Sequence, residues 1–287
     1  MPELPEVETV VRGLRSVFVG RYIDQVVLKR PDLRFPFPQN FVSRLQGCLV
    51  QSIDRRAKYI CMHLSSGETL LWHLGMSGRI VLDENESVDK HDHVFIHLRK
   101  EDTFASQNSS SDKATQIVRY RDPRRFGFMD LVPSQDLTTS KLINHLGPEP
   151  LSDDFDEDYL RRALESKTVA IKTAIMDAKV VVGVGNIYAS EALFRSRIHP
   201  ETAAKTVKKI PELVQAIKEV LEAAIQSGGS TLRDYVRPDG ELGYFQHTFF
   251  VYGKAGEMCQ VCQKDRIQQI KQAGRSTFFC GTCQEKE

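Results

Sequence analysis

No apolar run in the 287-residue sequence approaches the roughly 18 residues that a membrane-spanning helix needs. The first ten residues, MPELPEVETV, are acidic, whereas a secretory signal begins with positive charge and continues into an apolar core. An excess of one charge sign is also missing, because 39 Lys and Arg face 38 Asp and Glu, for a net charge of +1. These absences predict a cytoplasmic protein without a membrane partner, in which any anionic partner binds to local basic patches.

The composition is that of a folded globular protein. Hydrophobic residues make up 41% of the chain and charged residues 27%, which excludes a mainly disordered or fibrous protein. The length is about twice that of an average domain, so two domains, or one domain with appendages, are expected.

The first half of the chain combines one helix with β-type segments. Residues 3–18 have apolar side chains at helical spacing, and Pro5 suits a first helical turn. Residues 21–132 alternate short apolar segments with turns, which predicts an antiparallel sandwich or barrel. The predicted strands are 22–28, 59–64, 69–73, 79–82, 93–98 and 116–121. The polar, Ser-rich stretch 100–113 is interpreted as a solvated hairpin tip without a site.

The second half of the chain has helical patterns. Ser152 precedes an acidic turn, 153–158, of the kind that a helix N-terminus favours. Further helices are expected at 169–177, 186–196 and 207–227. The predicted fold class is therefore α+β, with a leading helix and β-sandwich domain (1–133), a linker (134–150), a helical domain (151–245) and a cysteine module (246–287).

Four of the six cysteines form two pairs, with seventeen residues between the pairs. This C-x2-C…C-x2-C spacing is typical of a four-thiolate zinc site, made here by Cys259, Cys262, Cys280 and Cys283. Two disulfides are the alternative, which fits poorly with a chain that lacks a secretory signal. Lys and Arg residues between the pairs are typical of a nucleic-acid-binding module. Cys48 and Cys61 are isolated and are expected to be core residues.

The N-terminus offers an unusual nucleophile. A small second residue normally permits removal of Met1, which would leave Pro2 with a secondary amine. An α-amino group has a pKa of about 7.7–8.0, so a fraction of it is uncharged at neutral pH and can form a Schiff base with an aldehyde-like carbon. Glu3 lies beside it and can transfer protons. These residues alone favour the alternative that the segment only begins a helix.

Two basic segments are candidates for phosphate contacts. Lys58 opens a predicted strand within RRAKY, whose two arginines can lower the pKa of the lysine and share a phosphate with it. A solvated surface lysine is the alternative. Residues 119–127 place arginines and Phe126 on a turn, where arginine can contact base edges and phenylalanine can wedge between bases. An exposed turn salt-bridged through Asp122 is the alternative.

Two further motifs leave their roles open. The segment 182–186, VGVGN, fails the dinucleotide-binding pattern, because Tyr188 stands where the third glycine belongs, and no nucleotide cofactor is expected. This turn either grips one phosphate through backbone N–H groups or is a plain turn capped by Asn186. His91 and His93 could chelate a metal, but without a third ligand nearby in sequence, packing or hydrogen bonding is favoured.

Seven segments in register along the chain resemble the bacterial formamidopyrimidine-DNA glycosylase family. They are PELPEVET (2–9), RRAKY (55–59), HLGMSG (73–78), DPRRFG (122–127), HLGPEPL (145–151), VVGVGNIYASEALF (181–194) and the closing cysteine pairs. The resemblance implies a β-sandwich joined to a helix–two-turns–helix domain, with a zinc β-hairpin that holds one structural Zn²⁺.

The resemblance also implies a monomeric base excision repair enzyme that acts on double-stranded DNA. Such an enzyme removes oxidised purines, chiefly formamidopyrimidines and 8-oxoguanine opposite cytosine, and then cuts the strand by β,δ-elimination as an AP lyase. It would be associated with the nucleoid when bound to DNA.

The resemblance assigns catalytic roles residue by residue. Pro2 matches the Schiff-base nucleophile and Glu3 its proton donor. Lys58 and Arg275 match the proton donors for β- and δ-elimination. The residues matched to DNA contacts are His73, Met76, Arg124, Phe126, Lys172, Asn186 and Arg275. Of these, Met76, Arg124 and Phe126 would fill the gap left by the extruded base, with Arg124 facing the orphaned cytosine, and the loop 231–244 would close over that base.

Two alternatives differ in substrate or in class. The sister branch that resembles endonuclease VIII shares this architecture but prefers oxidised pyrimidines. The PELPEVET start and the trio of Met76, Arg124 and Phe126 favour the purine branch. A non-catalytic DNA-binding protein would keep the zinc hairpin and the helical turn, and it would have an inert N-terminus.

Overall fold

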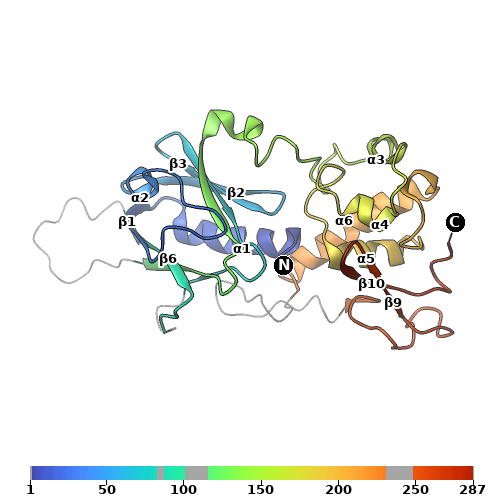
Figure 1. Cartoon of the computed structure of the whole chain (residues 1–287). Helices are drawn as coiled ribbons and strands as arrows, with labels where there is room; N and C mark the ends of the chain where they lie inside the picture. The colour runs from blue at the N-terminus through green and yellow to red at the C-terminus, as the bar shows by residue number, and fades with distance from the viewer. Residues whose placement is uncertain (1, 83–86, 101–115, 231–247, 287) are drawn as a thin grey trace, which may run out of the picture. The chain divides into compact units, whose positions relative to one another are not determined.

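The computed structural model describes residues 2–82, 87–100, 116–230 and 248–286 (Figure 1). The chain divides into two compact units. Unit 1 comprises Met1–Pro2, Glu6–Asn144 and Ser230–Gly243, and unit 2 comprises Glu3–Pro5, His145–Gly229 and Tyr244–Glu287. The predicted tip 100–113, except for residue 100, and the whole of the loop 231–244 lie outside the described residues. Within the described ranges, no helix has the length and apolar character that a bilayer crossing requires.

Unit 1 contains two four-stranded antiparallel sheets and the helix α1 (Leu4–Phe18). The first sheet has the order β1 (Tyr22–Leu28), β6 (Asp92–Arg99), β7 (Gln116–Arg121), β5 (Arg79–Val81). The second has the order β2 (Val50–Arg56), β3 (Tyr59–Leu64), β4 (Glu68–His73), β8 (Phe128–Pro133). One apolar core joins them, with Leu14 and Phe18 of α1, Trp72 of β4 and Tyr120 of β7 among its fully buried members. The predicted antiparallel β domain is therefore confirmed.

The six strands named from the sequence are all present, and three of them begin and end at the predicted residues. The other two strands, β2 and β8, and the short helix α2 (Phe41–Leu45) were not among the predicted elements. Both missed strands lie at the edges of the second sheet. β2 buries only Val50 and Ile53, because an edge strand needs fewer apolar residues, and its sequence pattern is correspondingly weak.

Unit 2 is helical and ends in a two-stranded hairpin. Its helices are α3 (Glu157–Leu164), α4 (Ile171–Ile175), α5 (Asn186–Arg195) and α6 (Ile210–Gln226), and the 3-10 turn η3 (Ala204–Thr206) precedes α6. A second 3-10 turn, η2 (Ser134–Thr139), follows β8 in unit 1. Strands β9 (Gln268–Gln272) and β10 (Arg275–Phe279) pair antiparallel. The helices share one core, and the hairpin has a smaller one that includes Cys259, Cys280 and Cys283.

Two predicted helix caps are wrong. The cap of α3 is Asp156, whose carboxylate accepts a hydrogen bond from the N–H of Tyr159 at 2.7 Å, and Ser152 lies in the preceding turn. The cap of α5 is Gly185, so Asn186 is the first helical residue. The acidic run 153–158 is expected to form the first turn of the helix, but α3 begins only at Glu157, so residues 153–156 precede it.

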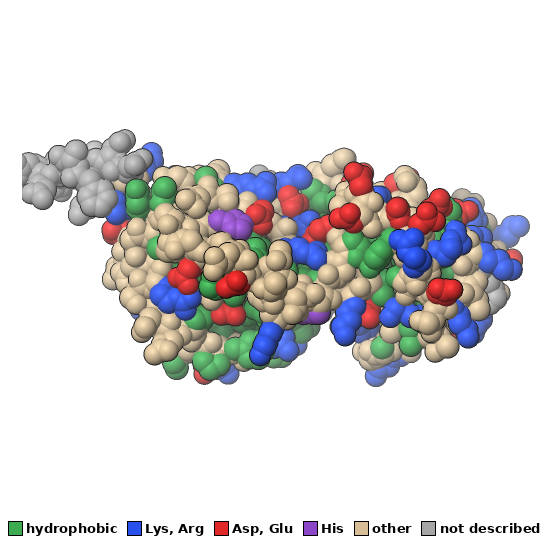
Figure 2. All heavy atoms as spheres, turned by 90° about the horizontal axis from the view of Figure 1, so that it is seen from above, with side chains coloured by type: hydrophobic (Ala, Val, Ile, Leu, Met, Phe, Trp, Pro, Cys, Tyr) green, Lys and Arg blue, Asp and Glu red, His purple; other side chains and the backbone are tan. Residues whose placement is uncertain are grey.

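The acidic start of α3 and the hairpin lie on opposite sides of unit 2, at the top and the bottom of that unit in Figure 1. Figure 2 views the molecule from the α3 side, and there carboxylates and cationic side chains are interspersed over unit 2. A mixed surface of this kind carries no strong field of one sign. We therefore expect an anion to bind to unit 2 near the hairpin rather than on the α3 side.

Candidate functional site

The carboxylate of Glu3 is bound at the N-terminus of α5. It accepts hydrogen bonds from the backbone N–H groups of Gly185 at 2.8 Å, Ile187 at 3.0 Å and Tyr188 at 3.4 Å. Glu3 is 3% exposed. The first N–H groups of a helix lack partners within the helix, and the helix dipole favours negative charge there. The N–H groups that could have gripped a phosphate therefore hold a carboxylate of the chain itself.

Two glycines permit this close approach. A Cβ placed on Gly185 would lie 2.3 Å from Cδ of Glu3, and one on Gly183 would lie 2.5 Å from Cβ of Leu4. Gly183 also has a φ of +79°, which side chains disfavour, and its carbonyl accepts a hydrogen bond from the N–H of Leu4 at 3.1 Å. The VGVGN turn is thus shaped to hold the residues that directly follow Pro2, which is itself buried.

Lys172, Asn186 and Thr277 form a buried network in unit 2. The ammonium of Lys172 donates to Oγ1 of Thr277 at 2.8 Å and to Oδ1 of Asn186. The amide of Asn186 donates to the carbonyl of Ser276 at 2.8 Å. Lys172 is 2% exposed, and this burial lowers its pKa to about 8. The network ties α4 and the first residue of α5 to strand β10.

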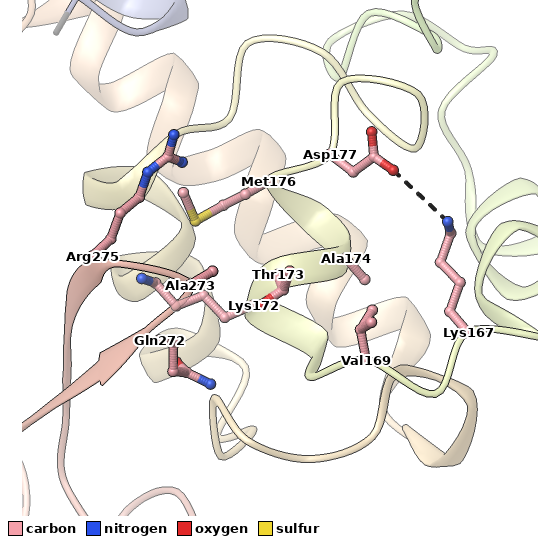
Figure 3. A pocket seen from close by; sticks show the side chains of 10 residues that line it. All are labelled: Lys167, Val169, Lys172, Thr173, Ala174, Met176, Asp177, Gln272, Ala273 and Arg275. Atoms are coloured by element: carbon pink, nitrogen blue, oxygen red, sulfur yellow. Dashed lines mark ion pairs between the residues drawn. The ribbon is translucent and has the colours of Figure 1, made fainter.

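A cavity of about 450 Å³ lies beside this network (Figure 3). Lys172 and Arg275 lie at one end, and an ion pair between Lys167 and Asp177, at 3.8 Å, lies at the other. The rest of the wall is formed by Val169, Thr173, Ala174, Met176, Gln272 and Ala273. Because Arg275 is exposed, this concave surface presents a guanidinium to an anionic group such as a phosphate.

In unit 1, the turn after β4 packs against the turn before β8. The buried carboxylate of Asp122 accepts hydrogen bonds from Oγ of Ser77 at 2.6 Å, the N–H of Gly127 at 2.8 Å and the hydroxyl of Tyr120 at 3.2 Å. A Cβ on Gly75 would lie 2.3 Å from the nitrogen of Gly127, so the two backbones touch. Asp122 is 0% exposed although the turn that follows it is exposed, so its carboxylate is a buried hydrogen-bond acceptor for both turns.

The same two turns present the three residues that the sequence assigns to the gap in DNA. Met76 is half-buried, whereas Arg124 and Phe126 are exposed. The guanidinium of Arg124 lies 4.9 Å from the ring centroid of Phe126. Arg125, between them, has a left-handed φ of +56°. The exposed ring of Phe126 is suited to wedge between bases, and the guanidinium beside it to bind a base edge or a phosphate.

The imidazole of His73 is a neutral hydrogen-bond donor. Its ring stacks on Phe128 at 5.2 Å between centroids, and Nδ1 accepts a hydrogen bond from the N–H of Gly75 at 3.0 Å. Burial lowers its pKa to about 4, and the nearby cations Lys58 and Arg34 act in the same direction. Because Nδ1 is the acceptor, the hydrogen-bond pattern assigns the proton of the neutral ring to Nε2.

Lys58 lies in the turn between β2 and β3, directly before the first residue of the predicted strand 59–64. Its neighbour Ala57 has a φ of +55°, and Lys58 is half-buried. Arg55 pairs with Glu8 at 3.0 Å, so one of the two cations expected to repel the lysine is compensated. The charge of Lys58 acts on His73. Lys58, assigned to the chemistry, and His73, assigned to a phosphate contact, are therefore close enough to interact electrostatically.

The four C-terminal cysteines have the geometry of a metal site. Their sulfur atoms all lie within 4.8 Å of one another, and the separations are 3.8 Å for Cys259 and Cys283 and 3.7 Å for Cys262 and Cys280. A tetrahedral site with metal–sulfur bonds of about 2.3 Å has edges of about 3.8 Å, so this spacing fits one ion. Backbone hydrogen bonds, first that from Lys264, lower the pKa of Cys262 to about 6, whereas burial raises the pKa values of Cys280 and Cys283.

No disulfide links these cysteines, so that alternative is not supported. Within the ranges that the structure describes, they are also the only cluster of His, Cys, Asp or Glu side chains suited to a metal. His93 instead bonds through Nε2 to the carbonyl of Asp122 at 2.9 Å, and buried Asp92 pairs with Arg121 at 2.6 Å. The expected packing and hydrogen-bonding roles of this segment are therefore confirmed for His93.

Comparison with known families and proteins identifies the β domain and the helical domain. The family model described as the formamidopyrimidine-DNA glycosylase N-terminal domain matches residues 1–129, and that of the H2TH domain of the same enzyme matches residues 146–236. The chain belongs to the formamidopyrimidine-DNA glycosylase family. A formamidopyrimidine-DNA glycosylase of Ruegeria pomeroyi is 45% identical over 99% of this chain and 100% of its own length. One of Methylorubrum populi is 46% identical over 99% of each chain.

Solved structures of formamidopyrimidine-DNA glycosylases have the same fold. The crystal structure of MutM (Fpg) from Thermus thermophilus matches with a TM-score of 0.85 and 36% identity, and covers 100% of both chains. The Lactococcus lactis Fpg in complex with DNA containing an abasic site matches with a TM-score of 0.87 and 34% identity, over 99% of this chain and 100% of that one. The predicted family and the α+β fold class are therefore confirmed.

The site contains residues that sequence reasoning did not identify. Asp122 was considered only as a salt-bridge partner, because it is surrounded by arginines in sequence. Thr277 stands 105 residues from Lys172, and no local pattern connects the two. Glu191 is buried and accepts hydrogen bonds from the N–H groups of residues 250–252 at 2.8 to 2.9 Å. One sign of this role was present in the sequence, since Glu191 is the only carboxylate in α5.

Proposed function

We propose that this chain is a bifunctional base excision repair enzyme. It would excise oxidised purines, including 8-oxoguanine opposite cytosine and formamidopyrimidines, from double-stranded DNA, and it would then cut the abasic strand. Family membership supports the glycosylase activity. The observation that carries the mechanism is the fixed carboxylate of Glu3, since its three N–H contacts immobilise the residue next to Pro2.

The first step uses the secondary amine that removal of Met1 gives to Pro2. Its lone pair attacks C1′ of a nucleotide that has been turned out of the duplex, the glycosidic bond breaks, and the base leaves with the bonding electrons and a proton. Opening of the sugar ring at O4′ then gives a cationic Schiff base. Attack turns the amine into an ammonium, whose N–H proton passes to the Glu3 carboxylate, and Glu3 then delivers this proton to O4′ as the ring opens, from a position that the α5 N-terminus fixes.

Two eliminations follow from the charge of the Schiff base. The iminium acidifies the hydrogen on C2′; a water molecule accepts this proton as the C3′–O bond breaks, and the 3′ phosphate leaves with the bonding electrons. A second proton loss along the conjugated sugar expels the 5′ phosphate. Lys58 is the proton donor for the first elimination and Arg275 for the second, and each cation also attracts the departing phosphate.

The DNA contacts follow the residues assigned from the sequence. Extrusion of a base costs a few kcal/mol, and insertion of Met76, Arg124 and Phe126 into the vacated space offsets that cost. The neutral Nε2–H of His73, together with Lys172, Asn186 and Arg275, contacts phosphates. Since Lys172 and Asn186 are bonded to each other, they act as one unit.

Cys259, Cys262, Cys280 and Cys283 would hold one structural Zn²⁺. Four thiolates close the coordination shell, so the ion has no open position for substrate, and it stabilises the hairpin. The hairpin in turn places Arg275, the first residue of β10, beside the cavity.

Borohydride trapping tests the mechanism. The purified chain is mixed with a duplex that contains 8-oxoguanine opposite cytosine, the Schiff base is reduced, and the modified peptide is mapped by mass spectrometry. The expected adduct is on Pro2 of chains that lack Met1. Pro2→Gly and Glu3→Gln should bind the duplex but release little base, whereas Glu222→Gln, at an exposed position of α6, should behave as wild type.

Two results would contradict the proposal. An adduct on Lys58, or none on any residue, would remove Pro2 from its role as nucleophile. Preferred cleavage of a thymine glycol duplex over the 8-oxoguanine duplex would replace oxidised purines with oxidised pyrimidines as the substrate class.

A further inference from the structure

The loop between β1 and α2 exposes an aromatic ring that the proposed mechanism does not use. Phe35 is 51% exposed, and among the aromatic residues in the described ranges only Phe35 and Phe126 are exposed. The guanidinium of Arg34 lies 5.4 Å from the Phe35 ring centroid, close to the 4.9 Å between Arg124 and Phe126. Unit 1 therefore presents two exposed pairs of the same chemistry.

The loop holds this pair in a fixed position. Leu33 is buried in the core of unit 1, and its N–H donates to the carbonyl of Phe35 at 3.0 Å. Asp32 and Pro36 form an isolated antiparallel β-bridge. The carboxylate of Asp32 also forms an ion pair with the guanidinium of Arg30 at 2.7 Å. A loop anchored on both sides loses little conformational entropy when its exposed residues bind a partner.

The two pairs are joined directly. The N–H of Arg34 donates to the carbonyl of Gly127 at 3.1 Å, at the end of the turn that carries Arg124 and Phe126. The Phe35 ring packs edge-on against Phe128 at 5.3 Å, and Phe128 is the ring on which His73 stacks. Arg34 and Phe35 thus continue the surface to which phosphate and base contacts have been assigned.

We infer that Arg34 and Phe35 are a second nucleic-acid contact of unit 1, in which Arg34 binds a backbone phosphate and Phe35 packs on the sugar or base beside it. The inference rests on the proposed function, because it places DNA along the Arg124–Phe126 turn. Exposed aromatic rings next to cations are the features with which proteins hold nucleic-acid strands. If a protein partner occupies this surface instead, the duplex will not change the emission of Phe35→Trp, and its affinity for the alanine variants will equal that for wild type.

Fluorescence gives a direct test of contact at Phe35. The chain has one tryptophan, Trp72, which is fully buried and therefore shielded from acrylamide, so Phe35→Trp adds the one indole that acrylamide can reach. Addition of a duplex with a tetrahydrofuran abasic-site analogue should shift the emission of that indole and protect it from acrylamide. Unchanged emission and unchanged quenching at saturating duplex would overturn the inference.

Salt dependence tests Arg34. The Arg34→Ala protein should bind the same duplex about tenfold more weakly, with a plot of log affinity against log salt that is shallower by about one unit. Phe35→Ala should also bind roughly tenfold more weakly, with an unchanged slope, because stacking releases no counterions. Arg34→Ala should keep the thermal unfolding midpoint because the arginine is exposed, and Phe35→Ala should lower it only slightly, because that ring loses an edge contact with Phe128.

Arg99→Ala is the matched control. Arg99 also covers an aromatic ring, that of Tyr22 at 4.6 Å. Asp92, seven residues earlier in β6, pairs with Arg121 beside the turn, so Arg99 lies about 23 Å along the strand from it. Its loss should change neither affinity nor slope. If wild type binds and all three alanine variants match it, the inference alone fails, and if wild type does not bind damaged DNA, the proposed function fails with it.

Discussion

The hydroxyl of Ser77 donates a 2.6 Å hydrogen bond to the carboxylate of Asp122, and this bond joins the turn that carries Met76 to the turn that carries Arg124 and Phe126. The three residues assigned to the DNA gap come from two segments about fifty residues apart in sequence. Their common placement depends on a buried acceptor that both turns share.

Asp122→Asn should therefore damage stability and activity together. An amide turns an NH₂ group toward Ser77 or toward the N–H of Gly127, and a buried unpaired donor costs about 1–3 kcal/mol of unfolding free energy. Displacement of the turn should lower the rate of base excision by at least about tenfold. Urea unfolding and single-turnover excision measure the two effects. Asp54→Asn, at an exposed position, should stay within about 0.5 kcal/mol of wild type.

Gly185→Ala should lower the rate of strand cleavage by displacing the carboxylate of Glu3. The new Cβ would lie 2.3 Å from Cδ of Glu3, so the carboxylate must leave the α5 N-terminus. Strand cleavage should fall by about a hundredfold, because a proton donor displaced by about 1 Å loses that much. In Gly253→Ala the Cβ meets nothing within 4 Å, and only the φ of +77° is strained. That control should lose about 1 kcal/mol of stability and keep its cleavage rate.

The low pKa of His73 predicts the sign of one pH effect. Its pKa is about 4 in the folded chain against 6.5 ordinarily, so between these values the unfolded chain binds more protons. The free energy of unfolding therefore falls as the pH decreases from about 6.5 toward about 4. His73→Phe keeps a ring on Phe128 and removes the titrating group, so it should lose less stability between pH 7 and pH 5. Equal losses in urea titrations of the two proteins would show that His73 is not neutral by burial.

Metal removal should act through the hairpin. A chelator, or Cys259→Ser, should lower bound zinc below one ion per chain and disorder β10, because the small core of the hairpin then loses the metal–sulfur bonds that join its two cysteine pairs. Loss of the Thr277 and Ser276 contacts to Lys172 and Asn186 should then weaken affinity for the abasic duplex by about tenfold or more. Cys48→Ser, in the core of unit 1, should retain one zinc per chain. Full DNA affinity in the metal-free protein would contradict a structural role for the ion.

Retention of Met1 should abolish excision. With methionine in place, the nitrogen of Pro2 is an amide without a free lone pair, so it cannot attack C1′. Preparations with and without Met1, quantified by intact mass, should show excision in proportion to the processed fraction. Binding to the abasic duplex should change by less, because the DNA contacts assigned here lie elsewhere in the chain. Equal excision rates per total protein would refute the amine mechanism.

Most strands and the four cysteine ligands were predictable because their signals are local. The strands 22–28 and 116–121 have apolar side chains that meet a core on one face, and the C-x2-C pairs fix two sulfurs each by spacing alone. The edge strand β2 was missed because it buries two side chains only. The cap of α3 was misplaced because five carboxylates compete within six residues, and only packing selects Asp156.

Composition, periodicity and motif spacing by themselves determined that the chain is an α+β protein with a cysteine-bound hairpin, and the seven segments determined its family. The tertiary structure decided what each polar group faces. It placed the Glu3 carboxylate on the N–H groups of α5, buried Asp122 between two turns, and set Lys172 against Thr277. These pairings join residues from 45 to more than 180 positions apart. Hydrogen-bond partners at such separations are chosen by the exclusion of water from a packed core, a property of the folded chain that no short stretch of sequence contains.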